Sequence, residues 1–149
     1  MGQSLVKNYL HIIFSTKNRS AYLNQENEKE IYSYIAKLCQ TKGCPTLAVG
    51  GNNDHVHVLC LLSKTLSLSD LIMFIKSNSS KWLNGKFGIE NFSWQNGYGA
   101  FSVNPREIQL VVDYISKQKE HHHQRSFQEE LLYFLHKYDI EYDKRYIWE

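Results

Sequence analysis

Residues 54–62 read DHVHVLCLL, a short run in which histidines alternate with valines before the chain becomes wholly apolar. Side chains at positions i and i+2 of a β-strand point to the same face. His55 and His57 therefore project together from a predicted strand over 55–62. The opposite face is an apolar stripe of Val56, Val58, Cys60 and Leu62. We expect this stripe to pack against helices and the histidine pair to lie on the open face of the sheet.

The segments on either side alternate between strand and helix patterns. Period-two alternation predicts further strands over residues 5–15, 46–50 and 92–103. Helical spacing predicts helices from about 24 to 42, 66 to 83, 105 to 120 and 127 to 138. The order β-α-β-β-α-β followed by two helices predicts an α+β, ferredoxin-like fold, with an antiparallel sheet and helices on one face. No linker-like stretch divides the chain, so we expect a single domain over 1–149.

Composition excludes several classes of protein. With 149 residues, 42% hydrophobic and 21% charged, the chain is typical of a globular domain rather than a disordered one. It has no apolar run of the roughly 20 residues that a membrane helix needs, and its N-terminus does not resemble a signal peptide. Three cysteines, an odd number without metal-finger spacing, fit a reducing cytoplasm. We therefore expect a cytoplasmic protein without a membrane partner.

The net charge of +2 is unevenly distributed. Residues 1–19 contain three basic residues and no acidic one, and residues 76–106 contain four basic residues and one acidic one. Two basic segments that meet in the fold would suit a phosphate backbone. The candidate DNA-binding residues are Lys17, Arg19, Lys76 and Lys81. Each of them is equally well explained as a solvated surface charge.

A second group of polar residues lies in the helix predicted from Pro105. Tyr114 and Gln118 are four residues apart and so share one face of that helix. A glutamine oxygen with two imidazoles would leave positions open on a divalent cation, and a tyrosine beside them could act as a nucleophile. The simpler interpretation is a surface tyrosine beside a solvated glutamine.

Three familiar kinds of His-x-His site do not fit. A histidine-triad hydrolase would need a histidine at position 59, where this chain has Leu59. A metallo-β-lactamase-type site would continue with Asp and His, but Leu61 and Leu62 follow. A two-histidine phosphoesterase needs a second His-x-Ser/Thr, which the sequence lacks.

Five motifs, in order, carry a resemblance to a known family. They are His11-x-x-Phe14-Ser15-x-Lys17-x-Arg19, Asp54-His55-Val56-His57, Lys76-x-x-Ser79-Ser80-x-Trp82, the stretch from Trp94 to Val103, and Tyr114-Ile115-x-x-Gln118-x-x-His121-His122. Together they resemble the small single-tyrosine transposases of the HUH (His-hydrophobe-His) nuclease superfamily, the group of insertion sequences numbered two hundred and six hundred five. The resemblance extends over nearly the whole chain.

This resemblance implies a role for each matching residue. It implies that Tyr114 is the nucleophile, carried on a C-terminal helix, and that His55, His57 and Gln118 are ligands of Mg²⁺ or Mn²⁺. It also implies a homodimer in a bacterial or archaeal cell that binds single-stranded DNA with a hairpin. The protein would cleave and rejoin DNA strands through a 5′-phosphotyrosine bond, without a nucleotide cofactor. In the family, the tyrosine helix of one subunit can complete the site of the other.

Other interpretations remain open from sequence alone. A ferredoxin-like module that binds hairpins without cutting them would need neither Tyr114 nor the histidine pair. A domesticated relative that cleaves repeat-associated hairpins would keep the same site. Tyr98, between two glycines, is interpreted as a turn or DNA-contact residue, and His121, His122 and His123 as packing or phosphate-contact residues. Trp82 and Trp94 are expected in the core rather than as base-stacking platforms.

Overall fold

The protein forms one antiparallel sheet flanked by helices. The computed structural model describes residues 2–121 and 125–149. Its strands are β1 (Tyr9–Ser15), β2 (Thr46–Asn52), β3 (His55–Leu61) and β4 (Gly99–Ser102), in the spatial order β2-β3-β1-β4. The helices are α1 (Glu28–Thr41), α2 (Leu68–Phe87), α3 (Ile108–Ser116), α4 (Gln118–His121) and α5 (Phe127–Lys137), with short 3-10 turns η1 (Lys17–Arg19) and η2 (Pro105–Glu107). The predicted β-α-β-β-α-β order and the α+β, ferredoxin-like fold class are confirmed.

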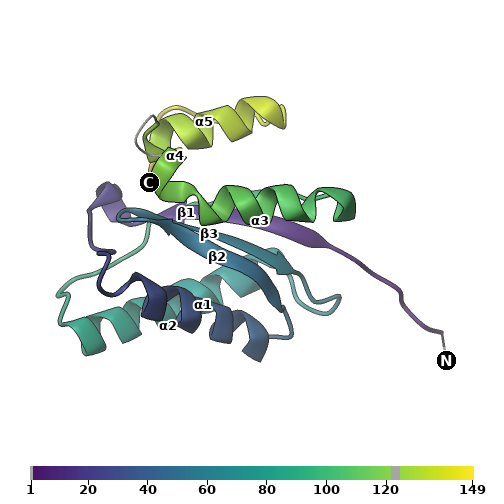
Figure 1. Cartoon of the computed structure of the whole chain (residues 1–149), viewed down its shortest axis with the longest axis horizontal. Helices are drawn as coiled ribbons and strands as arrows, with labels where there is room; N and C mark the ends of the chain where they lie inside the picture. Colours follow the sequence, from purple (N-terminus) through teal and green to yellow (C-terminus); the bar gives the residue numbers. More distant parts are fainter. Residues whose placement is uncertain (1, 122–124) are drawn as a thin grey trace.

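One face of the sheet is covered by α1 and α2, which lie together below it in Figure 1. The predicted apolar stripe of β3 faces these helices, and Val56, Val58 and Cys60 are all fully buried there. Helix α1 contributes Ile31 and Ile35, and α2 contributes Leu71 and Ile75, to the same core. Burying a side chain of this size stabilises the fold by about 1.5–3 kcal/mol. This layer forms the main hydrophobic core.

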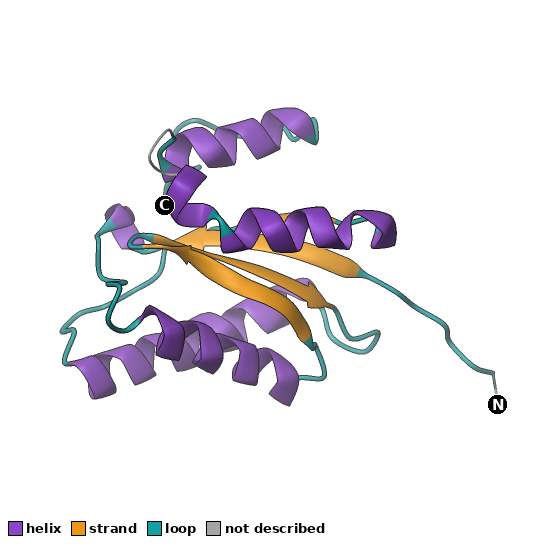
Figure 2. Ribbon diagram, in the orientation of Figure 1, coloured by secondary structure: helices purple, strands orange, loops and turns teal. Residues whose placement is uncertain are grey.

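The second face is not open, contrary to expectation. Helices α3, α4 and α5 lie over it, so that the sheet runs between two helical layers (Figure 2). Ile115 of α3 packs on Leu59, and an apolar stripe of α5 packs on Ile13. Helices α3 and α5 are amphipathic, and their apolar sides pack against this face of the sheet. The histidine pair is therefore enclosed between sheet and helices.

Several element boundaries differ from the sequence prediction, three of them near the site or at the sheet edges. The first strand begins at Tyr9 rather than residue 5, because its partner β3 ends at Leu61, opposite Tyr9. The last strand pairs only from Gly99, although an isolated bridge joins Trp94 to Thr16. The helix expected over 105–120 is interrupted at Lys117, whose backbone (φ −102°, ψ 21°) is not helical. The chain thus turns between α3 and α4, within the predicted site.

Trp82 and Trp94, the two tryptophans expected in the core, both pack against it. Trp94 is buried in the main core, and its Nε1 donates a hydrogen bond to Oγ of the buried Ser79 at 2.8 Å. Trp82 is partly buried against the same core and stacks on Tyr34, with ring centroids 4.3 Å apart.

The three cysteines, Cys39, Cys44 and Cys60, are free thiols in the interior. Within the described part of the chain, no helix has both the length and the apolar character needed to cross a membrane.

Candidate active site

The histidine pair lies on the central strand β3 and points toward the C-terminal helices. His57 lies opposite Ile13 of β1, and His55 lies opposite Ser15. The two side chains share a face, as the strand period predicts, and their ring centroids are 5.2 Å apart. Both are completely buried, whereas surface histidines would be partly exposed. Burial of two imidazoles requires polar partners on each of them.

The Nδ1 atom of each histidine is held by a neighbouring side chain. His55 Nδ1 donates to Oδ1 of Asp54 at 2.7 Å, and His57 Nδ1 shares a hydrogen bond with Nε2 of His11 at 2.7 Å. Burial, and secondarily the proximity of His57, lowers the pKa of His11 to about 3, so His11 is neutral at physiological pH. Partners of this kind fix the ring orientation of metal-binding histidines. Both Nε2 atoms are consequently directed toward α4 and α5.

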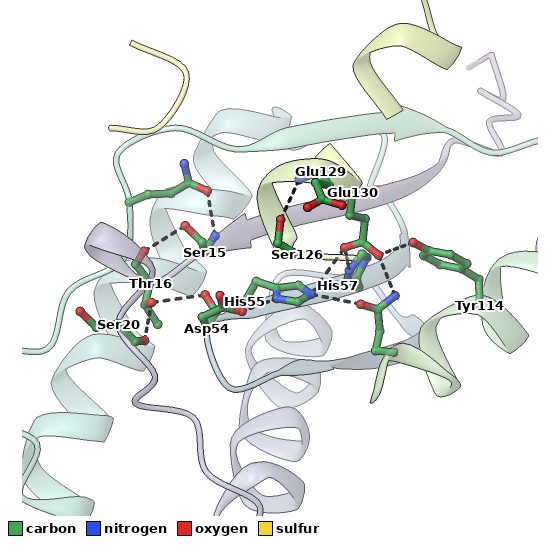
Figure 3. Close-up of polar contacts among 12 residues, drawn as sticks. Ser15, Thr16, Ser20, Asp54, His55, His57, Tyr114, Ser126, Glu129 and Glu130 are labelled. Carbon is green, nitrogen blue, oxygen red and sulfur yellow. Dashed lines mark hydrogen bonds and ion pairs between the residues drawn. The ribbon is translucent and has the colours of Figure 1, made fainter. Parts of the chain in front are cut away.

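Glu130 of α5 meets these Nε2 atoms, and sequence analysis did not identify it. Its side chain is fully buried, with Oε1 2.9 Å from Nε2 of His57 and 3.5 Å from Nε2 of His55. Figure 3 shows the carboxylate reaching from the helix between the histidines and Tyr114. A signal was present in the sequence, because Glu130 falls on the same helical face as Phe127, Leu131 and Phe134. An acidic residue within an apolar stripe indicates a carboxylate that becomes buried when the helix packs.

Gln118 lies at the start of α4 and reaches the same carboxylate. Its Oε1 is 3.0 Å from Nε2 of His55, and its Nε2 donates to Oε2 of Glu130 at 3.2 Å. The structure therefore brings Gln118 to the histidine pair as predicted. It does so across the turn at Lys117 rather than along one continuous helix.

Tyr114, near the end of α3, completes the cluster. Its hydroxyl donates a hydrogen bond to Oε2 of Glu130, and its ring lies 5.9 Å from that of His57, centroid to centroid (Figure 3). Burial, and then the adjacent Glu130 carboxylate, raises the pKa of Tyr114 well above its usual value of about 10. The phenol is thus protonated in this arrangement. Its proton already points at an acceptor.

The donor set suits a divalent cation. The ligating atoms of His55, His57 and Glu130 all lie within 4.8 Å of one another. The amide oxygen of Gln118 faces the same space, so lone pairs from two imidazoles, a carboxylate and an amide converge there. Oxygen donors with imidazole nitrogens can hold Mg²⁺ or Mn²⁺. The residues present therefore fit the expected metal, with Glu130 as an additional candidate ligand.

The sequence matches a known protein family. Residues 4–118, which include the histidine pair, Tyr114 and Gln118, match the family model described as "Transposase IS200 like". The chain belongs to the IS200-like transposase family. The transposases of insertion sequence IS200 from Salmonella typhimurium and Salmonella typhi are each 31% identical to it over 116 residues, covering 74% of this chain and 76% of the relative.

Two solved structures share the fold. A candidate transposase from Deinococcus radiodurans superposes with a TM-score of 0.62 at 20% identity, covering 79% of this chain and 96% of that one. A REP-associated tyrosine transposase bound to a REP hairpin gives a TM-score of 0.59 at 18% identity, covering 82% and 73% of the two chains. These likenesses confirm the architecture of an IS200-like transposase.

The two basic segments of this IS200-like transposase meet beside η1, as predicted. The backbone N–H of Lys17 donates to the carbonyl of Ser93 at 2.9 Å. Lys17 is exposed, while Arg19 is half-buried with its guanidinium 5.8 Å from the ring centre of Trp148. Lys81 lies on the exposed face of α2.

Lys76 differs from the other three basic candidates because its ammonium group is hydrogen-bonded to the backbone of the protein. Its Nζ donates to three consecutive carbonyl oxygens, those of residues 95–97, at 2.7–3.2 Å. Burial lowers the pKa of Lys76 to about 8. These contacts give Lys76 a structural role in holding the segment that leads into β4.

The remaining sequence candidates lie away from the cluster or outside the described residues. Tyr98 is 41% exposed in the loop before β4, where Nζ of Lys76 lies 5.8 Å from its ring centre. His122 and His123 lie outside the described residues, and of His121 only the backbone, at the end of α4, is described.

Proposed function

We propose that this IS200-like transposase cleaves and rejoins single-stranded DNA, with Tyr114 as the nucleophile. The observation that carries the proposal is the convergence of the Tyr114 hydroxyl and both imidazole Nε2 atoms on the buried Glu130 carboxylate. A non-catalytic DNA-binding module would have no need to bury these groups together, since buried polar groups are costly unless they are paired.

Each residue has a defined part in the proposed reaction. His55, His57 and Gln118 hold Mg²⁺ or Mn²⁺, with Glu130 as a further donor. The bound cation would polarise a phosphoryl oxygen and neutralise its developing charge. The Tyr114 oxygen attacks the phosphorus, which gives a 5′-phosphotyrosine and a free 3′-OH. A second 3′-OH reverses the attack, so the bond energy is conserved and no nucleotide cofactor is needed.

We propose a hairpin-bearing single strand as the substrate and a homodimer of the 149-residue domain as the active unit. The fold is shared with a transposase whose solved structure holds a REP hairpin. Strand transfer between two element ends requires two tyrosines in one assembly, and a symmetric pair is the simplest arrangement. Lys17, Arg19 and Lys81 supply phosphate contacts in this proposal.

The test uses single-stranded DNA from the flanks of the gene, labelled at its 3′ end, with Mg²⁺. The wild type should form a denaturant-resistant protein–DNA adduct that EDTA prevents. Tyr114→Phe removes one hydroxyl and should abolish the adduct while keeping hairpin binding. Tyr146→Phe is the matched control, with the same change on an exposed ring, and should form the adduct normally. Adduct formation by Tyr114→Phe would overturn the assignment.

A further inference from the structure

The two oxygens of Glu130 have different partners. Oε1 faces the histidine pair, 2.9 Å from Nε2 of His57. Oε2 accepts hydrogen bonds from the Tyr114 hydroxyl and from Nε2 of Gln118. The carboxylate therefore lies between Tyr114 and the histidine pair, with Oε1 toward the histidines and Oε2 toward Tyr114 and Gln118.

The fold keeps this carboxylate in place at an energetic cost. Glu130 is fully buried on a helical face that otherwise consists of apolar residues. An isolated charge in such a position would be strongly destabilising. Its placement in the first turn of α5, whose N-terminus is capped by Ser126, and its hydrogen bonds offset part of this cost. A leucine would avoid the buried charge, but it would also remove the acceptor of the Tyr114 hydroxyl and of the Gln118 amide, so the acid belongs with the polar cluster around it.

We propose that Glu130 is the general base of the strand-transfer reaction and removes the proton of Tyr114 through Oε2. This inference rests on the proposed function. As the phenolic O–H bond breaks, its proton passes to Oε2 and the new bond forms between the Tyr114 oxygen and phosphorus. The bond from phosphorus to the 3′ oxygen breaks, and that oxygen takes a proton from water. Glu130 later releases its proton to water, so the net step neither consumes nor produces protons.

Among the residues that the structure describes, the other groups around Tyr114 are less suited to this task. The amide of Gln118 is a poor proton acceptor. Both Nε2 atoms of the histidine pair face the proposed metal site, and both Nδ1 atoms are held by Asp54 and His11. His11 is adjacent to the Tyr114 ring, at 6.3 Å between centroids, but its Nε2 is committed to His57. Glu130 is the group that already accepts the phenolic hydrogen bond.

The return reaction uses the same geometry. When a 3′-OH attacks the phosphotyrosine, the departing Tyr114 oxygen needs a proton. Glu130 first takes a proton back from water and then gives it to that oxygen, its hydrogen-bond partner in the structure, while the attacking 3′-OH releases its own proton to water. One residue can therefore act as base during cleavage and as acid during rejoining, as microscopic reversibility requires.

The first experiment compares Glu130→Gln with Glu129→Gln in single-turnover adduct formation. Glu129 is the adjacent, exposed glutamate of the same helical turn, so the change is chemically identical. Hairpin binding and calorimetric Mn²⁺ binding are measured on both variants, so that rates are compared at saturating metal. Glu130→Gln should slow the adduct by about 10²-fold or more, the usual contribution of a general base. Glu129→Gln should match the wild type.

The second experiment separates proton acceptance from metal binding. Trifluorotyrosine, whose phenol is far more acidic than that of tyrosine, replaces Tyr114 in the wild type and in Glu130→Gln. An acidic nucleophile ionises without a base, so the penalty of Glu130→Gln should shrink to less than about tenfold. The same penalty with both nucleophiles would overturn the inference, as would a Glu130→Gln variant that cleaves at the wild-type rate. Absence of any adduct in the wild type would instead refute the proposed function itself.

Discussion

The Nε2 atom of His11 lies 2.7 Å from Nδ1 of His57, and this buried pair links the first strand to the candidate metal site. His11 and His57 stack at 5.0 Å between ring centroids. Asp54 holds the ring of His55 in the same manner, through its Nδ1 atom. The contact at Nδ1 thus helps to set the ring orientation of each histidine, and removal of that neighbour should be detectable in metal binding.

Replacing His11 by Phe should weaken Mn²⁺ binding by about 10–100-fold. Phenylalanine fills the same space but removes the hydrogen bond that His11 makes with Nδ1 of His57. Titration calorimetry on the folded variant measures the affinity directly, without DNA. His136→Phe, the same substitution at an exposed position of α5, is the control and should leave the affinity unchanged. Equal Mn²⁺ affinity in the two variants would show that His11 does not orient the ligand.

Helix α3 packs very closely on the sheet at Gly50 of β2. A Cβ atom added to Gly50 of β2 would lie 2.9 Å from both Cγ2 and the carbonyl oxygen of Ile115. Real Cβ atoms do not approach backbone so closely, and Ile115 directly follows Tyr114. We expect Gly50→Ala to displace α3, to destabilise the fold by about 1–3 kcal/mol and to slow adduct formation by at least about tenfold.

Gly85→Ala is the matched control for that substitution. Gly85 is exposed in α2, and a Cβ there would meet no atom within 4 Å. Alanine in a helix should stabilise the protein by about 0.5–1 kcal/mol and leave cleavage unchanged. Denaturant unfolding and single-turnover cleavage of both variants test the comparison. A fully active Gly50→Ala protein would mean that the α3 contact does not position Tyr114.

The periodicity of the sequence predicted which side chains share a face of a strand. The strand period placed His55 and His57 on one face, and the alternating valines identified the side that packs on α1 and α2. The spacing of Tyr114 and Gln118 predicted that they share one face of a continuous helix; that helix ends at Ser116, but both residues still contact Glu130. The roles assigned to these residues came from the family resemblance and stay predictions.

Glu130 and the closure of the second face depend on tertiary packing that local patterns do not specify. The apolar stripe of α5 shows that the helix must cover something, but it does not indicate which surface. Once α5 packs on Ile13, its one inward-facing acid meets the histidine pair. The turn at Lys117 also depends on tertiary packing. It changes the direction of the chain between α3 and α4, and Gln118 of α4 then contacts His55.

Alkaline pH should destabilise the protein through two buried thiols. Burial is the main cause that raises the pKa of Cys39 and of Cys60 to about 12, against about 9 in the unfolded chain. Their stabilising contribution is complete below pH 9 and is lost as the pH rises toward 12, because the unfolded state loses protons first. At pH 10 the loss relative to pH 8 should be about 1 kcal/mol per thiol.

Unfolding free energies of the wild type and of the Cys39→Ala/Cys60→Ala double variant at pH 8 and pH 10 measure this effect. The double variant is less stable at both pH values because it loses core packing. Its free energy of unfolding should fall between pH 8 and pH 10 by about 2 kcal/mol less than that of the wild type. An identical decrease in the two proteins would show that these thiols do not control the alkaline transition.

The candidate site is built from one chain, and this predicts how mixed dimers behave. Tyr114 and His57 lie in the same polypeptide and both contact Glu130. If the active protein keeps this arrangement, a dimer of one His57→Ala and one Tyr114→Phe subunit has a defect in each site. Mixing the two inactive variants should then give no adduct, even where exchange of tagged subunits is demonstrated by co-purification. Exchange of α3 between subunits would instead produce one intact site per mixed dimer, so recovered adduct would show that the tyrosine acts on the partner's histidine pair.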